Sequence, residues 1–415
     1  MFSREDNELL ARVGPGTPTG ELYRRYWIPA LLSEEIRESD GPPVRVKLLG
    51  EDLLAFRDTQ GRIGLIDEYC SHRRAPLFYG RNEECGLRCI YHGWKYDVEG
   101  KILETPAEPP ESTLKDHVRH TAYPCREAAE VVFTYMGPKE KMPLFPNFDW
   151  ITIPPAHVGV TKFFLNCNYL QAIEGDCDTS HVGYLHLGNR TGGGGDIAQI
   201  GAQDRAPKFE NEVTFYGIRS AAIRSLTDGM KSIDLFSYIM PFIACVPAGK
   251  KINGKLDGFL VVYQTPSDDY HTWRYNFRFK RSEPMTEEEL TADRFQIGPD
   301  YKLIANRDNH YLMDRQKHRN YSGMEGFATQ DACITEGMGP IVDRTREHLG
   351  ASDGYIVAVR LFLLKAVRDL QRGIEPPGLV WDPSKNDFSK ANCTSVRVPD
   401  GVSWREAEQQ MYGTK

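Results

Sequence analysis

Two short segments, EYCSHRRAPL at residues 68–77 and CIYHGWKYD at residues 89–97, each contain one cysteine and one histidine. Their combined spacing is C-x-H-x16-C-x2-H. The surrounding sequence consists of short runs rich in Val, Leu and Ile, divided by turns such as GED and TQG, which is typical of β-hairpins. We therefore expect two loops between strands to bring four metal-binding side chains together. These are Cys70, His72, Cys89 and His92.

Two kinds of metal centre suit these four side chains. Two thiolates and two imidazoles can hold a tetrahedral zinc ion, but zinc-binding loops usually pair cysteine with cysteine and histidine with histidine. One cysteine and one histidine in each loop favour a cluster of two irons and two sulfides, in which one iron binds the thiolates and the other the imidazoles. Cys85 is interpreted as a free thiol, because a site that used it with Cys89 would leave both histidines without a role. Tyr91 and Trp94 are expected to cover the cluster.

A second group of candidate ligands lies in QAIEGDCDTSHVGYLH, residues 171–186. If this segment is a regular helix, Glu174, Asp178 and His181 lie on one stripe. Three ionisable groups beside apolar neighbours are unfavourable without a compensating charge, and we expect a metal ion to supply it. His186 can join the site only if the helix loosens before it. Two histidines and a carboxylate form the facial triad of non-haem Fe(II) oxygenases; the alternative is a helix with two hydrogen-bonded core histidines.

The composition restricts the class of protein. A chain of 415 residues usually forms two or three domains. A net charge of −7 gives no reason to expect a nucleic-acid partner, which requires concentrated Lys and Arg. The charged N-terminal sequence MFSREDNELL does not resemble a signal peptide, and the apolar segments are too short or too charged to span a membrane. Nine cysteines, an odd number, argue against a disulfide framework. We therefore expect a cytoplasmic protein without a membrane partner.

Hydrophobic periodicity and the positions of Gly and Pro predict an α+β protein, in which an all-β domain precedes a larger domain with an antiparallel sheet flanked by helices. The expected helices lie near residues 168–186, 286–295, 328–347 and 353–372. The stretch TGGGGD at residues 191–196 lacks the spacing of a nucleotide-binding loop and is expected to be mobile. The expected divisions are an N-terminal segment, 1–44, the β-rich domain, 45–148, the larger domain, 149–375, and a polar tail, 376–415.

Taken together, these motifs resemble the oxygenase (α) component of the Rieske non-haem iron ring-hydroxylating oxygenases, the phthalate 4,5-dioxygenase type in particular. Two further segments share the resemblance, DNELLARVGPGTPTGELYRRYWIPALL at residues 6–32 and FATQDACITEGMGPIVDRTREHLGASD at residues 327–353. It implies a Rieske [2Fe-2S] domain and a helix-grip-like catalytic domain on which the N-terminal segment packs. The chain departs from the family at Ser71, where proline is common, at Arg74, where glycine is common, and at Tyr169, where tryptophan is common.

The resemblance also implies the roles of the candidate ligands. One cluster iron is expected to bind the two thiolates named above, and the other iron the two imidazoles. His181 and His186 are expected to bind a mononuclear Fe(II), with Asp331 as the third ligand. Glu336 and Asp343 lie in the same stretch of sequence and remain alternatives to Asp331.

The resemblance further implies that Asp178 connects an iron ligand with a cluster histidine, by position His92, of a neighbouring subunit. Electrons would then cross between the subunits of a head-to-tail ring, which is expected to be a homotrimer or a hexamer of stacked trimers. They would come from a separate NAD(P)H-dependent reductase with a flavin and an iron–sulfur centre, since this chain contains no dinucleotide-binding fingerprint. The mononuclear iron would use O₂.

A small aromatic substrate is expected, and an aromatic carboxylate that undergoes phthalate-like dioxygenation is the first candidate. A carboxylate favours arginines in the pocket; Arg205, Arg219 and Arg224 lie in the expected wall, whereas YIMPFIACVPAG at residues 238–249 is uncharged. An O-demethylase acting on a methoxylated or ether-linked aromatic acid is the alternative, because the same ligands serve both reactions. Two other classes stay open: an electron-transfer protein that uses only the cluster, and a binding protein structured by zinc.

Overall fold

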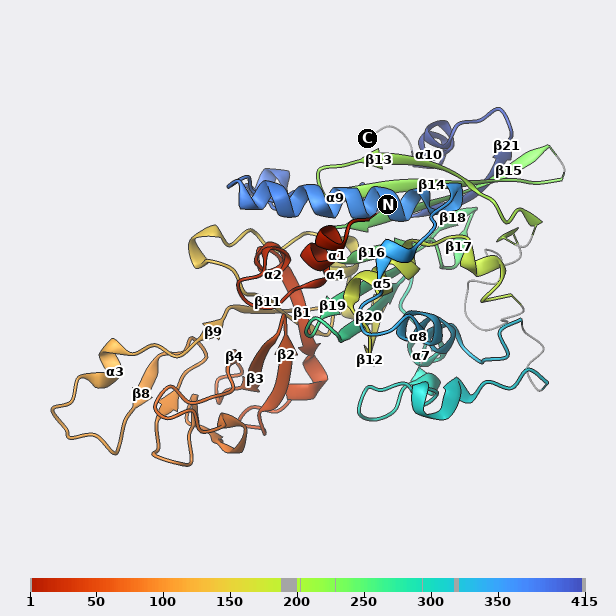
Figure 1. Ribbon diagram of the computed structural model, residues 1–415. Helices are drawn as coiled ribbons and strands as arrows, with labels where there is room; N and C mark the ends of the chain where they lie inside the picture. The colour runs from red at the N-terminus through yellow and green to blue at the C-terminus, as the bar shows by residue number, and fades with distance from the viewer. Residues whose placement is uncertain are drawn as a thin grey trace.

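Two β-rich regions divide the chain: a smaller one at the lower left of Figure 1, and a larger one at the right that contains most of the helices. The computed structural model describes residues 2–187, 200–201, 203–227, 229–292, 294–316 and 321–412, so the predicted loop at 191–196 lies outside the described residues. The predicted α+β class is confirmed. Within the described ranges, no helix is both long and apolar enough to cross a membrane.

The smaller region contains two four-stranded antiparallel sheets. The first has the order β2 (Val44–Leu48), β3 (Glu51–Arg57), β4 (Ile63–Asp67) and β9 (Ala122–Tyr123). The second has the order β5 (Arg81–Glu83), β6 (Gly86–Arg88), β7 (Lys95–Tyr96) and β8 (Ile102–Glu104). A small core that includes Phe56, Leu87 and Trp94 joins the two sheets. The two Cys/His motifs therefore occupy the loops that follow β4 and β6.

A three-stranded sheet lies between the two regions. It consists of β1 (Trp27–Leu32), β11 (Val131–Tyr135) and β10 (Cys125–Ala128). Phe133 of β11 contacts the rings of Tyr263 and Phe277 in the larger region, at centroid distances of 6.1 and 6.4 Å. The main hydrophobic core therefore continues from this sheet into the larger region.

The larger region is built on an eight-stranded antiparallel sheet. Seven strands follow the order β12 (Val158–Leu165), β20 (Thr272–Phe279), β19 (Leu260–Pro266), β16 (Ile243–Val246), β15 (Met230–Ile239), β14 (Gly217–Ser225) and β13 (Lys208–Val213). The eighth, β21 (Thr394–Pro399), pairs with β15. A polar tail was predicted at 376–415, and this prediction is wrong for β21 and for α10 (Trp404–Tyr412). Strand β21 extends the sheet, and Trp404 of α10 is buried against it.

Helices pack on the large sheet and on one another. They are α1 (Arg4–Ala11), α2 (Pro18–Tyr23), α4 (Asp149–Thr152), α5 (Tyr169–Cys177), α7 (Glu287–Thr291), α8 (Phe327–Gly337) and α9 (Gly354–Gln371), with α3 (Leu114–His117) in the smaller region. Helix α5 contacts β16 and β19, while α8 and α9 contact α5. The N-terminal helices α1 and α2 pack against α9 (Figure 1).

Three predicted helices are shorter in the structure. The helix expected at 168–186 ends at Cys177, because Asp178 has an extended backbone with φ −82° and ψ 117°. The helix expected at 328–347 ends at Gly337 and is followed by Gly339, whose φ of 93° lies in the left-handed region, and by a proline. The helix expected at 353–372 is confirmed by α9, whereas α7 covers only part of 286–295.

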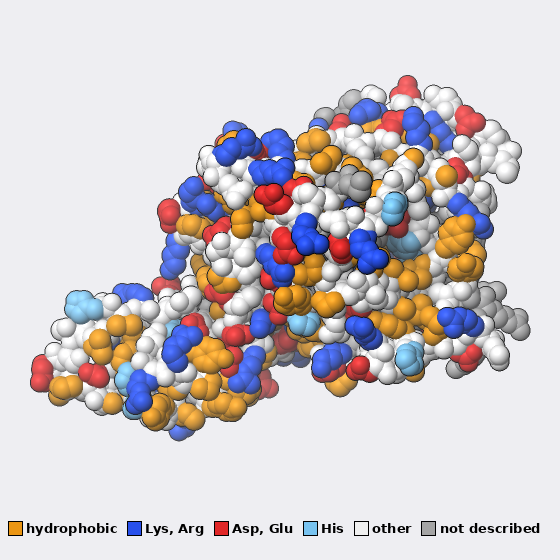
Figure 2. All heavy atoms as spheres, in the orientation of Figure 1, with side chains coloured by type: hydrophobic (Ala, Val, Ile, Leu, Met, Phe, Trp, Pro, Cys, Tyr) orange, Lys and Arg blue, Asp and Glu red, His pale blue; other side chains and the backbone are white. Residues whose placement is uncertain are grey.

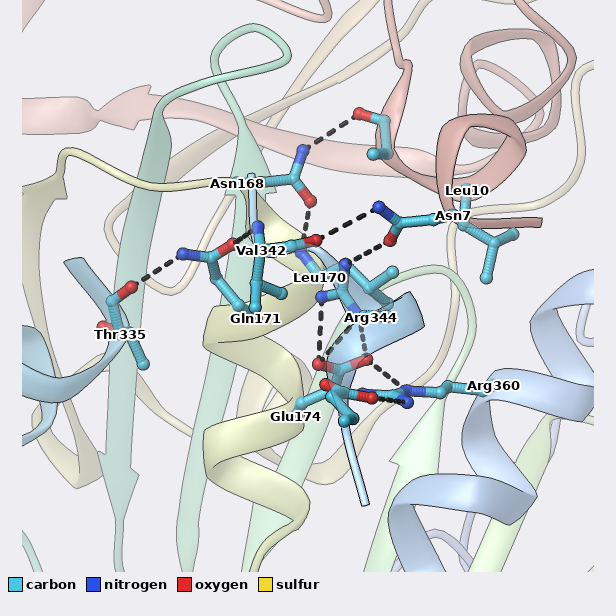
Figure 3. Close-up of polar contacts among 12 residues, drawn as sticks. Asn7, Leu10, Asn168, Leu170, Gln171, Glu174, Thr335, Val342, Arg344 and Arg360 are labelled. Carbon is cyan, nitrogen blue, oxygen red and sulfur yellow. Dashed lines mark hydrogen bonds and ion pairs between the residues drawn. The ribbon is translucent and has the colours of Figure 1, made fainter. Parts of the chain in front are cut away.

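Glu174 is buried in α5 between two arginines (Figure 3). Arg344 Nη2 lies 2.9 Å from Glu174 Oε2, and Arg360 Nε donates to Glu174 Oε1 at 2.6 Å. Arg344 Nη1 also donates to Asn7 Oδ1 at 2.8 Å, which extends the network to α1. The expectation that a metal ion compensates Glu174 is therefore wrong, because two guanidinium groups compensate it. Burial acts to raise the pKa of Glu174, but the charges and hydrogen bonds of the two arginines outweigh burial and lower this pKa.

We expect Glu174→Ala to destabilise the protein, because it leaves two buried guanidinium groups without their shared carboxylate. The expected loss is about 3–5 kcal/mol, the usual effect of breaking a buried ion pair by removing one partner. Thermal unfolding of the purified variant measures it. Glu283→Ala is the control, since Glu283 is exposed and its buried partner Lys280 also pairs with Glu289. Equal midpoints for both variants would contradict the role of Glu174.

Candidate metal centres

The first motif forms a turn that its own backbone closes around Cys70. Cys70 N donates to Ala75 O at 2.9 Å, and Arg74 N donates to Cys70 O at 2.8 Å. Arg74 has a φ of +59°, a left-handed conformation that favours glycine. This conformation gives a physical reason why glycine is common at this position in the family that the chain resembles.

The second motif forms a similar turn around Cys89. Cys89 N donates to Trp94 O at 2.8 Å, and Gly93 N donates to Cys89 O at 3.0 Å. Gly93 has a φ of +74°, and a Cβ added there would lie 2.5 Å from Pro106 Cγ. Glycine is therefore required at this position for two reasons, the backbone conformation and the close approach of the proline. Like Cys70, Cys89 is buried and takes part in no disulfide.

The two turns bring their histidines together. The rings of His72 and His92 lie 4.6 Å apart, and His72 stacks on Trp94 with 4.8 Å between ring centroids. His72 Nδ1 is buried and has no hydrogen-bond partner, which is unfavourable unless a further group binds it. Two buried thiols, two imidazoles and an orphaned ring nitrogen fit a [2Fe-2S] cluster. Trp94 covers this site as predicted, whereas Tyr91 contacts His92 from an exposed position.

Tyr96 and His120 add a polar layer that was not predicted from the sequence. The Tyr96 hydroxyl lies 3.0 Å from Cys70 Sγ and accepts a hydrogen bond from Ser71 N at 3.1 Å. Ser71 Oγ lies 2.7 Å from His120 Nδ1, and His120 Nε2 lies 2.9 Å from Asp67 O. His120 comes from a distant part of the chain, so no local spacing could have identified it.

The second centre is formed by the sequence just after α5 and by α8. His181 Nε2 and His186 Nε2 lie 3.1 Å apart, and Asp331 Oδ1 lies 3.8 Å from the first and 3.1 Å from the second. These three ligand atoms lie within 4.8 Å of one another. The short turn His181–Gly183 that follows the extended Asp178 directs both histidines to one point, which a continuous helix would not do.

Each histidine is oriented by a second side chain. His186 Nδ1 lies 2.7 Å from Gln330 Oε1, and His181 Nδ1 lies 3.5 Å from Asp178 Oδ2. Partners on Nδ1 leave Nε2 of both rings directed at the common point, the arrangement typical of metal-binding histidines. Gln330 precedes Asp331 in α8 and was not predicted from the sequence.

The other acidic candidates are engaged elsewhere. Glu336 accepts hydrogen bonds from Asn166 N at 2.8 Å and from the Tyr311 hydroxyl at 2.6 Å. Asp343 accepts from Thr345 N at 3.1 Å at the surface. Of the three carboxylates considered for the third position, the structure therefore places only Asp331 with the histidines.

The carboxylate of Asp331 is ionised at neutral pH. Burial acts to raise its pKa, but the charges of His186 and His181 and the hydrogen bond from His186 lower it to about 2. Burial also acts to raise the pKa of Asp178, but its hydrogen bond and charge interaction with His181 lower it. Two imidazoles and an ionised carboxylate on one side of a common point fit a mononuclear Fe(II) with open positions.

A cavity of about 390 Å³ adjoins the second centre. His181 and Asp331 line it together with apolar side chains. They include Phe163, Leu165, Ala172 and Leu185. Such a cavity suits a small, largely apolar ligand.

The arginines predicted for the pocket wall do not line this cavity. Arg205 donates to the Tyr184 hydroxyl at 2.9 Å, Arg219 pairs with Glu408, and Arg224 donates to Thr179 O at 2.7 Å. The uncharged stretch 238–249 also lies elsewhere: it includes the end of β15, all of β16 and the residues that connect and follow them. The cavity instead contains Arg274 of β20, which the sequence did not single out.

Comparison with known protein families divides the chain into two parts. Residues 26–124 match the Rieske [2Fe-2S] domain, and residues 134–414 match the family described as LigXa C-terminal domain like. The first match excludes the zinc interpretation. The second excludes a protein that carries only a cluster.

Several curated relatives match over most of the chain. The phthalate 4,5-dioxygenase oxygenase subunit of Pseudomonas putida is 38% identical, with 98% of this chain and 94% of that protein covered. The 3-chlorobenzoate-3,4-dioxygenase oxygenase subunit of Comamonas testosteroni is 35% identical, covering 99% and 98%. The 5,5'-dehydrodivanillate O-demethylase oxygenase subunit of Sphingobium sp. is 32% identical, covering 93% and 85%. Among solved structures, Pseudomonas putida CBB5 NdmA with caffeine is similar in fold, with a TM-score of 0.62 at 17% identity over 93% of this chain and 100% of that chain.

We expect Asp331→Ala to weaken binding of Fe(II) at the second centre. Loss of an outer partner alone commonly lowers metal affinity about 10- to 100-fold, so loss of a ligand is expected to lower it at least as much. Competition with a ferrous chelator measures this affinity, while the visible absorption of the [2Fe-2S] cluster shows that the first centre is intact. Asp343→Ala is the control, because Asp343 was considered as the third ligand and lies elsewhere in the structure. If Asp343→Ala weakened Fe(II) binding and Asp331→Ala did not, the assignment would be contradicted.

Proposed function

The chain belongs to the Rieske non-haem iron oxygenases as an oxygenase component, and we propose that it hydroxylates a small aromatic carboxylate with O₂. The observation that carries this proposal is the cluster of His181, His186 and Asp331 on the wall of a mostly apolar cavity. The two relatives of highest identity described above are named as dioxygenases of phthalate and 3-chlorobenzoate, both aromatic carboxylates.

We assign the residues of each centre as follows. Cys70 and Cys89 would bind one iron of the cluster, and His72 and His92 would bind the other. His181, His186 and Asp331 would bind the mononuclear iron. When bound, the cluster supplies single electrons and the mononuclear iron supplies a site at which O₂ is activated.

The residues around the second centre hold its ligands ready. Asp178 accepts a hydrogen bond from Ser180 N at 2.7 Å, which fixes the carboxylate beside His181 Nδ1. The carboxylate thereby favours a proton on Nδ1 and leaves Nε2 free to bind metal. Gln330 Oε1 does the same for His186. The apolar part of the cavity wall would contact the ring of an aromatic substrate.

We further propose that electrons reach Asp178 from His92 of a neighbouring subunit in a homotrimer or a hexamer of stacked trimers. Exposed apolar side chains near both centres support such a contact. Ile90 and Tyr91 beside His92 are 63% and 57% exposed. Ile334 on α8 and Met338 just after it are 44% and 50% exposed. Figure 2 shows hydrophobic side chains on the surface of both the smaller and the larger region.

The electron donor would be a separate NAD(P)H-dependent reductase with a flavin and an iron–sulfur centre. The proposed location is the cytoplasm, and the proposed role is the breakdown of aromatic compounds. O-demethylation of a methoxylated or ether-linked aromatic acid is the second candidate, because a relative that covers most of the chain is named as an O-demethylase.

Turnover with a reductase, NADH and a panel of aromatic acids tests the reaction. We expect products that gain two oxygen atoms and retain all carbons, as in dioxygenation. Loss of a methyl group with release of formaldehyde would support the second candidate instead. Asp331→Ala is the control: any product that this variant still forms does not depend on the proposed iron site. If the wild type forms no product from any acid in the panel, both proposed reactions are contradicted.

Mixed oligomers test electron transfer between subunits. We expect His92→Cys and Asp178→Asn each to abolish most of the turnover, because the first alters the cluster and the second breaks the connection to the iron. Co-expression of the two variants with different affinity tags yields complexes that contain both. If electrons cross between subunits, these complexes regain part of the activity, since an intact cluster then faces an intact Asp178. Activity as low as in the separate variants would contradict the proposal.

A further inference from the structure

The buried side chain of Arg224 in β14 contacts the short segment that connects α5 to the first histidine of the second centre. Arg224 Nη2 donates to Thr179 O at 2.7 Å and lies 3.3 Å from Thr179 Oγ1. Thr179 is also buried, and it lies between Asp178 and His181, whose side chains face each other. A side chain 45 residues further along the chain therefore holds the backbone between these two residues.

Thr179 lies outside the helices of the described chain. Helix α5 ends before Asp178, which is extended, and the short turn begins only at His181. A buried backbone carbonyl requires a hydrogen-bond partner, and for Thr179 O the guanidinium of Arg224 is such a partner. The bond connects the end of α5 with the large sheet, to which β14 belongs.

Asp234 of β15 is the counter-charge of Arg224. It is fully buried, and its Oδ2 lies 3.4 Å from Arg224 Nη1. Within the described part of the chain, Arg224 Nε is buried without a hydrogen-bond partner. A buried ion pair stabilises a fold only when its geometry is good and its remaining polar atoms are satisfied. The pair with Asp234 therefore gives little reason for a buried arginine here, whereas the shorter bond to Thr179 O does.

Arg219 in the same strand provides a matched comparison. It is buried, pairs with Glu212 of β13 and Glu408 of α10, and has an Nε that finds no hydrogen-bond partner among the described residues. Arg219 and Arg224 thus share their strand, their burial and their pairing with carboxylates. They differ in the bond to the backbone just before His181.

We propose that Arg224 is a positioning residue for the mononuclear iron, because its bond to Thr179 O sets the direction in which His181 presents Nε2. This inference rests on the proposed function, which places iron at His181. Thr179 lies just before the turn that carries His181, so a shift of its carbonyl moves the imidazole. Asp178, which orients His181 Nδ1, directly precedes Thr179 and is held by the same bond.

Two variants that both lack the buried ion pair isolate the bond to Thr179. Asp234→Asn keeps the guanidinium, whereas Arg224→Met/Asp234→Asn removes both charges and leaves no unpaired buried charge. Arg219→Met is the matched control. Each protein is stripped of mononuclear iron, and the visible absorption of the [2Fe-2S] cluster shows that the first centre is intact.

Two measurements report on the iron site without turnover. Titration with Fe(II) under argon, in competition with a ferrous chelator, gives the Kd; nitric oxide then gives Fe(II) an EPR signal that depends on the arrangement of its ligands. Loss of a residue that orients a ligand commonly weakens metal binding about 10- to 100-fold, and we expect about 10-fold for Arg224, which acts through the backbone. The double variant is expected to show this loss and an altered EPR signal relative to Asp234→Asn. Arg219→Met is expected to match the wild type in both.

Equal Fe(II) affinities and EPR signals in the double variant and in Asp234→Asn would overturn the inference. A lower thermal midpoint of the double variant with an unchanged iron site would do the same, because Arg224 would then serve stability alone. Equal weakening of Fe(II) binding by Arg219→Met would assign the effect to the loss of any buried arginine from β14. If Asp234→Asn does not fold, the double variant is compared with the wild type and with Arg219→Met.

The proposed function fails in a different way. If the wild type binds no Fe(II) that Asp331→Ala releases, the iron assignment is wrong and the role of Arg224 falls with it. If the wild type binds Fe(II) at this site and the double variant binds it equally well, the iron assignment stands and only the role of Arg224 is removed.

Discussion

The buried contact of Glu174 with Arg344 and Arg360 holds together the elements on which the second metal centre depends. Glu174 lies in α5, Arg360 in α9, and Arg344 connects to Asn7 of α1. Because a buried carboxylate requires a compensating charge, this contact specifies how three distant segments meet. It thereby positions the end of α5, where the chain becomes extended and turns both histidines toward α8.

Both groups of proposed ligands are held in place by neighbouring backbone and side chains. In the smaller region, backbone hydrogen bonds close the two turns around the cysteines, and Trp94 stacks on His72. In the larger region, Asp178 and Gln330 orient the two histidine rings. Ligands that already face one point lose little conformational entropy when a metal binds, and this agrees with the family's use of two iron centres.

The fold decides which charged side chains line the cavity. The negative charges of Asp178 and Asp331 belong to the second centre, and Asp176 neutralises Arg274. Sheet topology brings this arginine to the cavity, since β20 lies next to β19 and β19 contacts α5. The arginines that sequence reasoning proposed, such as Arg219 and Arg224, pair with acidic residues elsewhere in the fold.

The sequence by itself determined the α+β class, the four residues of the cluster motifs and the two histidines of the second centre, because each set lies within a short span whose spacing reflects local backbone geometry. Only the tertiary structure decided among Asp331, Glu336 and Asp343, since α8 meets α5 through long-range packing. It also decided that arginines, and not a metal, compensate Glu174. Contacts between residues far apart in the chain depend on how the elements pack, and no local pattern in the sequence encodes that packing.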